Sequence, residues 1–458
     1  YWIVEINAPY GYVLSDKEIP VNVDGTATEI FMNFDNTTQK GQVYVEKYGE
    51  MLADVETSET KYGTLYTPIY EEKYLEGVTY QITAREDIIT PEGTLWYSAG
   101  DVVDTFTTVD GATTSSLLQL GKYSITEINT PEGFVLDPTV YDFDIEYGGQ
   151  LIDVVEIKQS YKNDRQKLDL EITKTFEDED PDAYKDVVFG VYAKDEIIVR
   201  EPVEEVIPVL LSYDEDDDSG RVCIPADGLV GILTLDENGH NVEQLDLPAG
   251  DYYIRELETN VGFVLDEENH EFTFEYGETS LESIQVGKVL HNEKRRLDLE
   301  VNKVDSEHKD HFLNGAIFEV YDKTAGKYVA SLCSGNLMIK GSEKDEEYEI
   351  AKDEAFEEII KTAKTDENKE IIIDLDDGIY YSRKAGSEEV TKHIVKDGKA
   401  VLADAIYGHE YEFKEIKAPV SYKLADKSKA YKVEADRDSD IVIVYFENDR
   451  IIVPNTGV

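Results

Sequence analysis

The chain has 458 residues, a length that corresponds to about three domains of ordinary size. It carries 44 Lys and Arg against 99 Asp and Glu, which gives a formal net charge of −55. A surface this acidic repels phosphate backbones and anionic membranes, and therefore argues against nucleic-acid binding. Acidic chains are often disordered, but disorder requires few aromatic residues. With 31 Tyr, 15 Phe and 41% apolar residues, this chain can build folded cores.

The first repeated element is an aromatic segment that leads to a Glu at its fifth position. It occurs at residues 1–12, 123–134, 252–263 and 411–422, and supplies Glu5, Glu127, Glu256 and Glu415. Alternation with a period of two predicts a strand that carries the Glu on its apolar face. A turn with Pro and Gly follows, although the third copy lacks the Pro and Ser421 replaces the Gly in the fourth. In the third copy Glu258 shares the strand face of Glu256, so either could be the functional residue.

Two further strands keep a fixed relation to this segment. After each Glu, an alternating strand ends in an Asn on its mostly apolar face, at Asn36, Asn163, Asn292 and Asn448. Eleven residues after each of the first three Asn, the next alternating strand carries a Lys, at Lys47, Lys174 and Lys303. Such a constant spacing indicates a repeated structural unit.

The repeats divide the chain into domains. Residues 1–38 hold the end of a truncated domain, 39–164, 165–293 and 294–450 are complete domains, and 451–458 form a tail. Because no strand with a Lys precedes Glu5, we expect the sequence to begin inside a domain of a longer protein. Short alternating strands separated by Gly, Asn and Asp turns predict an all-β fold of tandem β-sandwiches, arranged as a rod.

The last complete domain contains extra sequence between its Lys and its Glu. Its residues 343–367 place apolar side chains at helical spacing, which predicts a short helical insertion. The apolar residues concerned are Tyr348, Ile350, Ala355, Phe356, Ile359 and Ile360. Because the segment is acidic, it can be a solvated decoration or a ligand-binding element.

Burying a Lys on an apolar strand face is costly unless the amine is paired or neutral. One interpretation is a buried Lys–Glu salt bridge with an Asn hydrogen-bonded beside it. The other is a reaction, because desolvation lowers the pKa of Lys and raises the pKa of Glu. The neutral amine then attacks the Asn side chain, while the Glu polarises the carbonyl and carries protons to the departing ammonia. The product is a Lys–Asn isopeptide bond, made once, so no enzyme with turnover is predicted.

The Y-x-x-x-E-x-x-A-P-x-G-Y segment, the early Lys and the final Asn together resemble the Cna protein B-type domains of Gram-positive surface proteins and pilins. These domains are also called SpaA-like or prealbumin-like, and the resemblance implies small prealbumin-like or Ig-like β-sandwiches with internal isopeptide bonds. The implied groups are Lys47, Glu127 and Asn163, then Lys174, Glu256 and Asn292, then Lys303, Glu415 and Asn448. The truncated copy keeps Glu5 and Asn36. By the estimate used for disulfides, closing a loop of this size contributes on the order of 4–5 kcal/mol.

The tail carries a short motif that resembles the L-P-x-T-G signal cleaved by sortases between Thr and Gly. Its residues are Val453, Pro454, Asn455, Thr456 and Gly457, with Val in place of Leu. The resemblance implies an extracellular protein anchored to the cell wall. Its implied partners are sortase and, through Thr456, peptidoglycan or a pilin Lys.

Other functional classes find little support. Cys223 and Cys333 lack the spacing of a zinc site or a disulfide framework, so we expect unpaired thiols. No cofactor motif is present, and no apolar run approaches the roughly 20 residues of a membrane helix. The acidic segment Asp214–Gly220 resembles a calcium loop, but Ser219 and Pro225 break the pattern and favour a solvated turn. The sequence thus predicts no metal and no cofactor.

The predicted function is therefore the stalk of a wall-anchored adhesin, stabilised by isopeptide bonds. A pilus subunit assembled by sortase is the alternative, although no Tyr-Pro-Lys motif of the pilin type is present. A carbohydrate-active enzyme is a remote alternative, because paired carboxylates can serve a glycosidase. Each repeated Glu is nevertheless matched to a Lys and an Asn. The sequence does not identify a host ligand.

Overall fold

A computed structural model describes residues 1–25, 29–178, 182–199 and 221–452. Within these ranges the regular secondary structure consists of strands, apart from one short 3-10 turn at Tyr184–Asp186. This confirms the all-β class. The strands up to Asn292 are β1 (Trp2–Ile3), β2 (Ile19–Pro20), β3 (Lys40–Thr60), β4 (Gly63–Tyr74), β5 (Thr79–Ala84), β6 (Ile88–Ile89), β7 (Leu95–Tyr97), β8 (Val102–Thr107), β9 (Ala112–Thr114), β10 (Leu118–Gln119), β11 (Gly121–Asn129), β12 (Val140–Ile145), β13 (Val154–Asn163), β14 (Lys167–Phe176), β15 (Val188–Ala193), β16 (Ile197–Val199), β17 (Arg221–Ile224), β18 (Leu229–Thr234), β19 (His240–Leu245), β20 (Gly250–Glu258), β21 (His270–Phe274) and β22 (Ser283–Asn292).

The remaining strands belong to the last part of the chain. They are β23 (Arg296–Asp305), β24 (Ile317–Asp322), β25 (Lys327–Cys333), β26 (Leu337–Lys340), β27 (Glu347–Ala351), β28 (Ile359–Lys364), β29 (Glu370–Ile373), β30 (Gly378–Lys384), β31 (Val390–Lys396), β32 (Lys399–Ile406), β33 (Glu410–Lys417), β34 (Lys429–Lys432) and β35 (Ile441–Asn448). The chain divides into two compact units, each described by itself below. The first comprises Tyr1–Lys174, Val187–Leu257 and Glu267–Leu290, and the second comprises Thr175–Asp186, Glu258–Asp266 and His291–Val458.

In the first unit, one sandwich is formed around β3 and β11. Strand β3 pairs in parallel with β13, while β11 lies between β12 and β5 in a four-stranded sheet. Apolar side chains from both sheets meet in one buried core, among them Val43 and Val45 from β3 and Tyr123 and Ile125 from β11. Their alternation along each strand sends every second side chain inward, as the period of two predicts.

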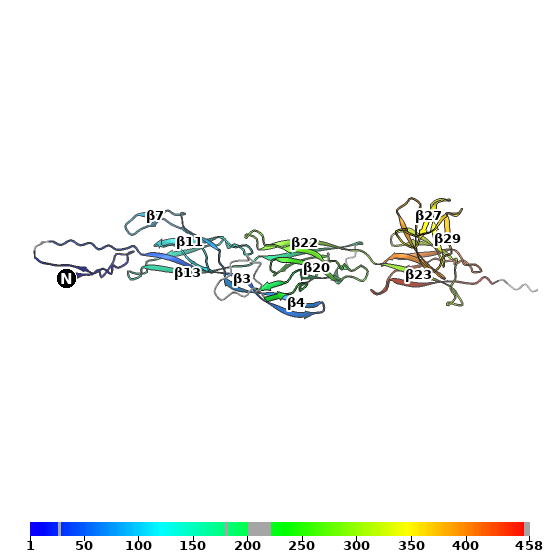
Figure 1. The fold of residues 1–458 in the computed structure, drawn as a ribbon, viewed down its shortest axis with the longest axis horizontal. Helices are drawn as coiled ribbons and strands as arrows, with labels where there is room; N and C mark the ends of the chain where they lie inside the picture. Colours follow the sequence, from blue (N-terminus) through cyan, green and yellow to red (C-terminus); the bar gives the residue numbers. More distant parts are fainter. Residues whose placement is uncertain (26–28, 179–181, 200–220, 453–458) are drawn as a thin grey trace, which may run out of the picture. The chain divides into compact units, whose positions relative to one another are not determined.

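The same unit contains a long hairpin that the sequence did not reveal. Strand β3 continues past the sandwich to Thr60 and turns into β4, which pairs with it along its length. Leu65 of β4 then pairs in parallel with Leu229 of β18, so the hairpin joins the sheet of β18, β15, β20 and β21. Figure 1 shows the blue β4 beside the green strands around β20. Strands β19, β14 and β22 form a separate three-stranded sheet.

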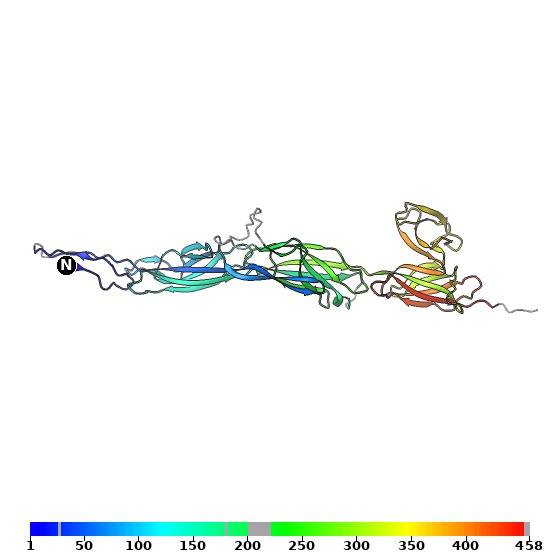
Figure 2. The same ribbon diagram turned by 60° about the horizontal axis from the view of Figure 1, so that its bottom comes forward.

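The second unit contains a sandwich into which extra strands are inserted. Its seven-stranded sheet has the order β28-β27-β30-β31-β32-β23-β35, and a four-stranded sheet has the order β25-β24-β33-β34. Leu299 and Val301 of β23 share a buried core with Phe318 of β24 and Phe413 of β33. The inserted strands β26 to β31 have a second core, which includes Ile350. They form a lobe of their own beside the host strands, coloured yellow to orange in Figure 2.

The predicted helix within residues 343–367 is wrong, because this segment forms the antiparallel hairpin of β27 and β28. The apolar residues that mimic helical spacing are divided between two strands and their turn. At the turn the Asp353 carboxylate accepts hydrogen bonds from the backbone N–H groups of Glu357 and Glu358 at 2.9 and 3.0 Å. Phe356 adopts a positive φ of 57°, which a helix does not allow.

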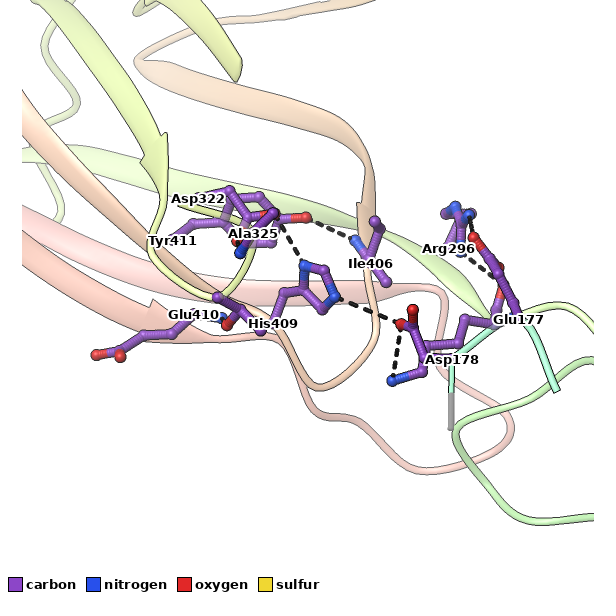
Figure 3. Close-up of polar contacts among 11 residues, drawn as sticks. Glu177, Asp178, Arg296, Asp322, Ala325, Ile406, His409, Glu410 and Tyr411 are labelled. Atoms are coloured by element: carbon purple, nitrogen blue, oxygen red, sulfur yellow. Dashed lines mark hydrogen bonds and ion pairs between the residues drawn. The ribbon is translucent and has the colours of Figure 1, made fainter. Parts of the chain in front are cut away.

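Within the second unit, the segment that follows β14 is held by charges from the last sandwich (Figure 3). Arg296 lies 2.6 Å from Glu177, and the His409 Nε2 atom lies 3.8 Å from Asp178. The other His409 ring nitrogen, Nδ1, lies 2.8 Å from the buried carboxylate of Asp322. These contacts tie Glu177 and Asp178 to the last sandwich.

We expect Leu65→Asp to release the hairpin from β18. Leu65 packs against Tyr192, Leu229 and Tyr253, and a carboxylate placed there loses its water without gaining a partner, at a cost of about 1–3 kcal/mol. Amide hydrogen exchange across Gly63–Tyr74 should become faster. The exposed Thr67→Asp is the matched control, and equal exchange in the two variants would show that the hairpin is held in another way.

Candidate functional site

The three lysines that the sequence singled out are fully buried. Lys47, Lys174 and Lys303 are each 0–1% exposed and rank among the largest buried side chains of the described residues. The glutamates Glu127, Glu256 and Glu415 and the asparagines Asn163, Asn292 and Asn448 are each no more than 4% exposed. Buried polar groups of this kind need partners, because desolvation without a hydrogen bond or an opposite charge is costly.

Strand register places Lys and Asn on one face. Lys47 pairs with Tyr161 in the parallel ladder of β3 and β13, and Lys303 pairs with Phe446 in the ladder of β23 and β35. Each Asn stands two residues beyond the partner of the Lys. Because side chains alternate with a period of two, this Asn and the Lys point to the same side of the sheet.

The Glu comes from the facing sheet. Glu127 on β11 pairs with Tyr80 on β5, and Glu415 on β33 pairs with Phe318 on β24. Lys and Asn therefore reach inward from one sheet and Glu from the other. The three side chains meet in the apolar core between the two layers.

In the group around Lys47, each of the three side chains is hydrogen-bonded to the other two. Lys47 Nζ donates to Glu127 Oε2 at 2.7 Å and to Asn163 Oδ1 at 2.5 Å. Asn163 Nδ2 in turn donates to Glu127 Oε1 at 2.6 Å. The amine thus lies against the carbonyl end of the carboxamide, while the carboxylate contacts both the amine and the amide nitrogen.

The group around Lys303 repeats this arrangement. Lys303 Nζ donates to Asn448 Oδ1 and lies 3.4 Å from Glu415 Oε1. Asn448 Nδ2 donates to both carboxylate oxygens of Glu415 at 2.9 Å. The predicted residues of the last sandwich are therefore brought together.

For the remaining predicted residues the contacts are described within each unit. In the first unit, Lys174 Nζ lies 3.0 Å from Glu256 Oε1, and both side chains are at most 1% exposed. Glu256 is thus the carboxylate paired with Lys174. In the second unit, Asn292 at the end of β22 donates from Nδ2 to Thr259 Oγ1 at 3.1 Å.

Burial changes the protonation of Lys47 and Lys303 in the direction that the sequence suggested. Desolvation lowers the pKa of Lys47 from its usual 10.5, and the hydrogen bond and charge of Glu127 oppose the shift only in part. Desolvation likewise lowers the pKa of Lys303 to about 8, against the charge of Glu415. A larger share of each amine is therefore neutral near pH 7 than for an exposed Lys.

Aromatic rings line the amines. Lys47 Nζ lies 5.9 Å from the ring centre of Tyr80, Lys174 Nζ 5.4 Å from that of Phe189, and Lys303 Nζ 4.8 Å from that of Phe446. Such rings exclude water while their faces still attract a cation. They provide a dry setting for both the amine and the carboxamide.

The copy of the motif at the start of the chain, with Glu5 and Asn36, keeps the Glu–Asn contact. Asn36 Nδ2 donates to Glu5 Oε1 and Oε2 at 3.0 and 2.8 Å, and also to the Val13 carbonyl at 3.0 Å. The Ser15 N–H donates to Glu5 Oε2 at 2.9 Å. The predicted pair is therefore brought together in the described residues.

The inserted strands share two backbone contacts with the group around Lys47, which the sequence analysis missed. Lys384 pairs with Tyr348 in the ladder of β30 and β27, just as Glu127 pairs with Tyr80. The Gly341 N–H donates to the Lys369 carbonyl at 2.8 Å, as the Lys47 N–H does to that of Gly111. In these two contacts Gly341 and Lys384 take the backbone positions of Lys47 and Glu127, but the Lys384 side chain is exposed. The sequence Gly378-Ile-Tyr380 could have revealed this resemblance. The Tyr380 hydroxyl donates to the carbonyl four residues earlier, as the hydroxyls of Tyr123 and Tyr252 do.

Some predictions fall outside the described residues. These are the sortase-like motif Val453–Gly457 and the acidic segment Asp214–Gly220. In the part of the chain that the structure describes, no group of three or more His, Cys, Asp or Glu side chains could hold a metal ion. Nor do those residues include a helix long and apolar enough to cross a membrane. Cys333 is buried and Cys223 is half-buried.

Comparison with protein families decides the classification. The SpaA family, described as a prealbumin-like fold domain, matches residues 69–160, 169–287 and 297–450. The chain belongs to this family. The three SpaA-type matches cover Glu127, Glu256 and Glu415. The third match also covers Asn448, whereas the first ends three residues before Asn163 and the second five residues before Asn292. No curated protein sequence matches the chain.

Several solved structures resemble this SpaA-type chain. The Bacillus anthracis TIE protein is 18% identical with a TM-score of 0.43, covering 90% of this chain and 51% of that one. BcpA, the major pilin subunit of Bacillus cereus, is 16% identical with a TM-score of 0.24, covering 90% of this chain and 100% of that one. The major pilin SpaD from Corynebacterium diphtheriae is 15% identical with a TM-score of 0.19, at 90% and 98% coverage. The chain therefore spans about half the length of the Bacillus anthracis protein.

Proposed function

We propose that the protein is a pilus or surface subunit of a Gram-positive bacterium, located outside the cell and linked to its wall. Its SpaA-type domains are closed by Lys–Asn isopeptide bonds that form without an enzyme. The bonds are Lys47–Asn163, Lys174–Asn292 and Lys303–Asn448, assisted by Glu127, Glu256 and Glu415. The observation that carries the proposal is the buried contact of Lys47 Nζ with both Glu127 and Asn163.

The reaction balances without a cofactor. The neutral amine of Lys47 attacks Asn163 Cγ, and a new C–N bond forms. Glu127 takes a proton from the attacking nitrogen and delivers it to Asn163 Nδ2, with which it is already hydrogen-bonded. The bond from Cγ to Nδ2 then breaks, and ammonia leaves. Since the Lys and the Asn are consumed, each site reacts once and the protein is not an enzyme.

A bond of this kind also explains why an ion pair is placed in the core. A buried salt bridge contributes little net stability, because desolvation of two charges offsets their attraction. A covalent link instead closes a loop between the first and last strands of a domain, worth on the order of 4–5 kcal/mol by the chain-entropy estimate. It also bears tension along the chain.

The proposal includes attachment to the cell wall by a sortase. The sortase-like motif at 453–457 offers Thr456 for transfer to peptidoglycan or to a Lys of another pilin. The protein would then be either the stalk of a wall-anchored adhesin or a subunit of a sortase-assembled pilus. Immunoblots of cell-wall extracts distinguish them, because a ladder of linked subunits supports the pilus and a single species supports the stalk.

Intact mass of the denatured protein tests the crosslinks. We expect a deficit of three ammonias relative to the sequence, because each bond releases one. Glu127→Ala should restore the mass of one ammonia, and the peptide that contains Asn163 should then appear free. Glu132→Ala, an exposed carboxylate in the adjoining turn, is the control and should leave the deficit intact. The peptide that contains Asn36 should show no loss of ammonia. An undiminished mass of the intact wild-type protein would refute the crosslinks.

The rate of bond formation should depend on pH through the amine. Because burial lowers the pKa of Lys303 to about 8, its neutral fraction rises about tenfold per pH unit below that value and then levels off. Protein recovered unfolded from inclusion bodies would be refolded between pH 5 and 9. Timed samples would be quenched in acid, and the Lys303–Asn448 peptide pair quantified by mass spectrometry. A rate independent of pH would show that loss of the Lys303 proton does not limit the reaction.

A further inference from the structure

A second acceptor holds the amide nitrogen that the proposed reaction expels. Asn163 Nδ2 donates one hydrogen to Glu127 and the other to Thr130 Oγ1 at 2.8 Å. Thr130 is 4% exposed and Asn163 is 2% exposed, so water does not compete for this contact. The same hydroxyl–amide contact joins Asn292 and Thr259 at 3.1 Å. Both threonines stand three residues after their Glu.

Where the chain has Ala at this position, a backbone carbonyl takes the same role. Ala418 follows Glu415 by three residues, and there Asn448 Nδ2 donates to the Lys423 carbonyl at 2.9 Å. Ala8 likewise follows Glu5, and there Asn36 Nδ2 donates to the Val13 carbonyl. With both amide hydrogens taken, the carboxamide is held with its oxygen toward the amine. The Asn side-chain nitrogen therefore has this second acceptor in all four copies. The acceptor is a Thr hydroxyl in two copies and a backbone carbonyl in the other two.

The two acceptors differ once the amide is attacked. A carbonyl oxygen can only accept a hydrogen bond, whereas a hydroxyl can accept and donate. In the planar amide, the nitrogen offers hydrogens and no basic lone pair. After attack on Cγ the nitrogen becomes pyramidal and basic, and a group that can donate to its lone pair stabilises it.

We propose that Thr130 is a catalytic residue for closure of the Lys47–Asn163 bond, through its contact with the leaving nitrogen. The inference rests on the proposed crosslinking function. Before attack, the Thr130 hydroxyl accepts from Nδ2 and fixes the carboxamide. After attack, the hydroxyl rotates and donates to the nitrogen lone pair until Glu127 delivers its proton there, and it then accepts again from the protonated nitrogen. The threonine proton is not transferred, because Glu127 carries the proton from Lys47 to the nitrogen, so one amide and one ammonia are still the only products.

The test compares two closure reactions within one chain. Full-length protein recovered unfolded would be refolded at pH 7.5, quenched in acid at timed intervals and digested. The Lys47–Asn163 and Lys303–Asn448 peptide pairs would be quantified by mass spectrometry. The second pair, which has Ala418 in place of a Thr, is the internal control for folding.

We expect Thr130→Val to slow the first closure about tenfold to a hundredfold, with the second closure unchanged. Thr130→Ser keeps the hydroxyl and should restore most of the rate. Equal first-closure rates in Thr130→Val and wild type would overturn the inference. Equal slowing by Val and Ser would also overturn it, because the methyl group and not the hydroxyl would then matter. Wild-type protein that never loses ammonia from Asn163 would instead refute the crosslinking function itself.

Discussion

The constraint on which this structure depends is the burial of a lysine amine in the middle of an apolar sandwich. Lys47, Lys174 and Lys303 occupy core positions where an aliphatic side chain would be stabilising without any partner. Each therefore requires a carboxylate, and where the group is described in full it also requires an asparagine. The parallel pairing of first and last strands and the facing strand with its Glu provide those partners.

The proposed bonds also decide which parts of the chain bear tension. Force would enter a domain at its Lys and leave at its Asn, because the proposed bond joins these two residues directly. From Asn163 the chain reaches Lys174 through a three-residue link and then along β14. The β3–β4 hairpin and the inserted strands β26 to β31 both lie within closed loops, so they would carry no load. Additions of this kind can therefore vary without weakening the covalent path.

Much of the candidate site could be predicted from the sequence. Side chains alternate between the two faces of a strand, so the spacing of two residues shows whether they point to the same face. A Glu at the fifth position of an alternating segment and a Lys eleven residues after an Asn must point inward if their neighbours do. The residues that act beside them could not be predicted in this way. Thr130 follows β11 and contacts Asn163 at the end of β13. Where Ala stands in the place of this Thr, a backbone carbonyl makes the same contact, which the sequence does not reveal.

The sequence by itself determined the all-β class, the repeated unit and the Lys, Glu and Asn of each group, since these follow from local alternation and constant spacing. Only the tertiary structure showed that residues 343–367 form two strands and a turn, with Phe356 at positive φ. The spacing of their apolar residues resembles that of a helix. The tertiary structure also decided that β4 joins the sheet of β18 and that Lys384 pairs with Tyr348 as Glu127 pairs with Tyr80. The physical reason is the same in each case, because strand pairing depends on residues far apart in the chain.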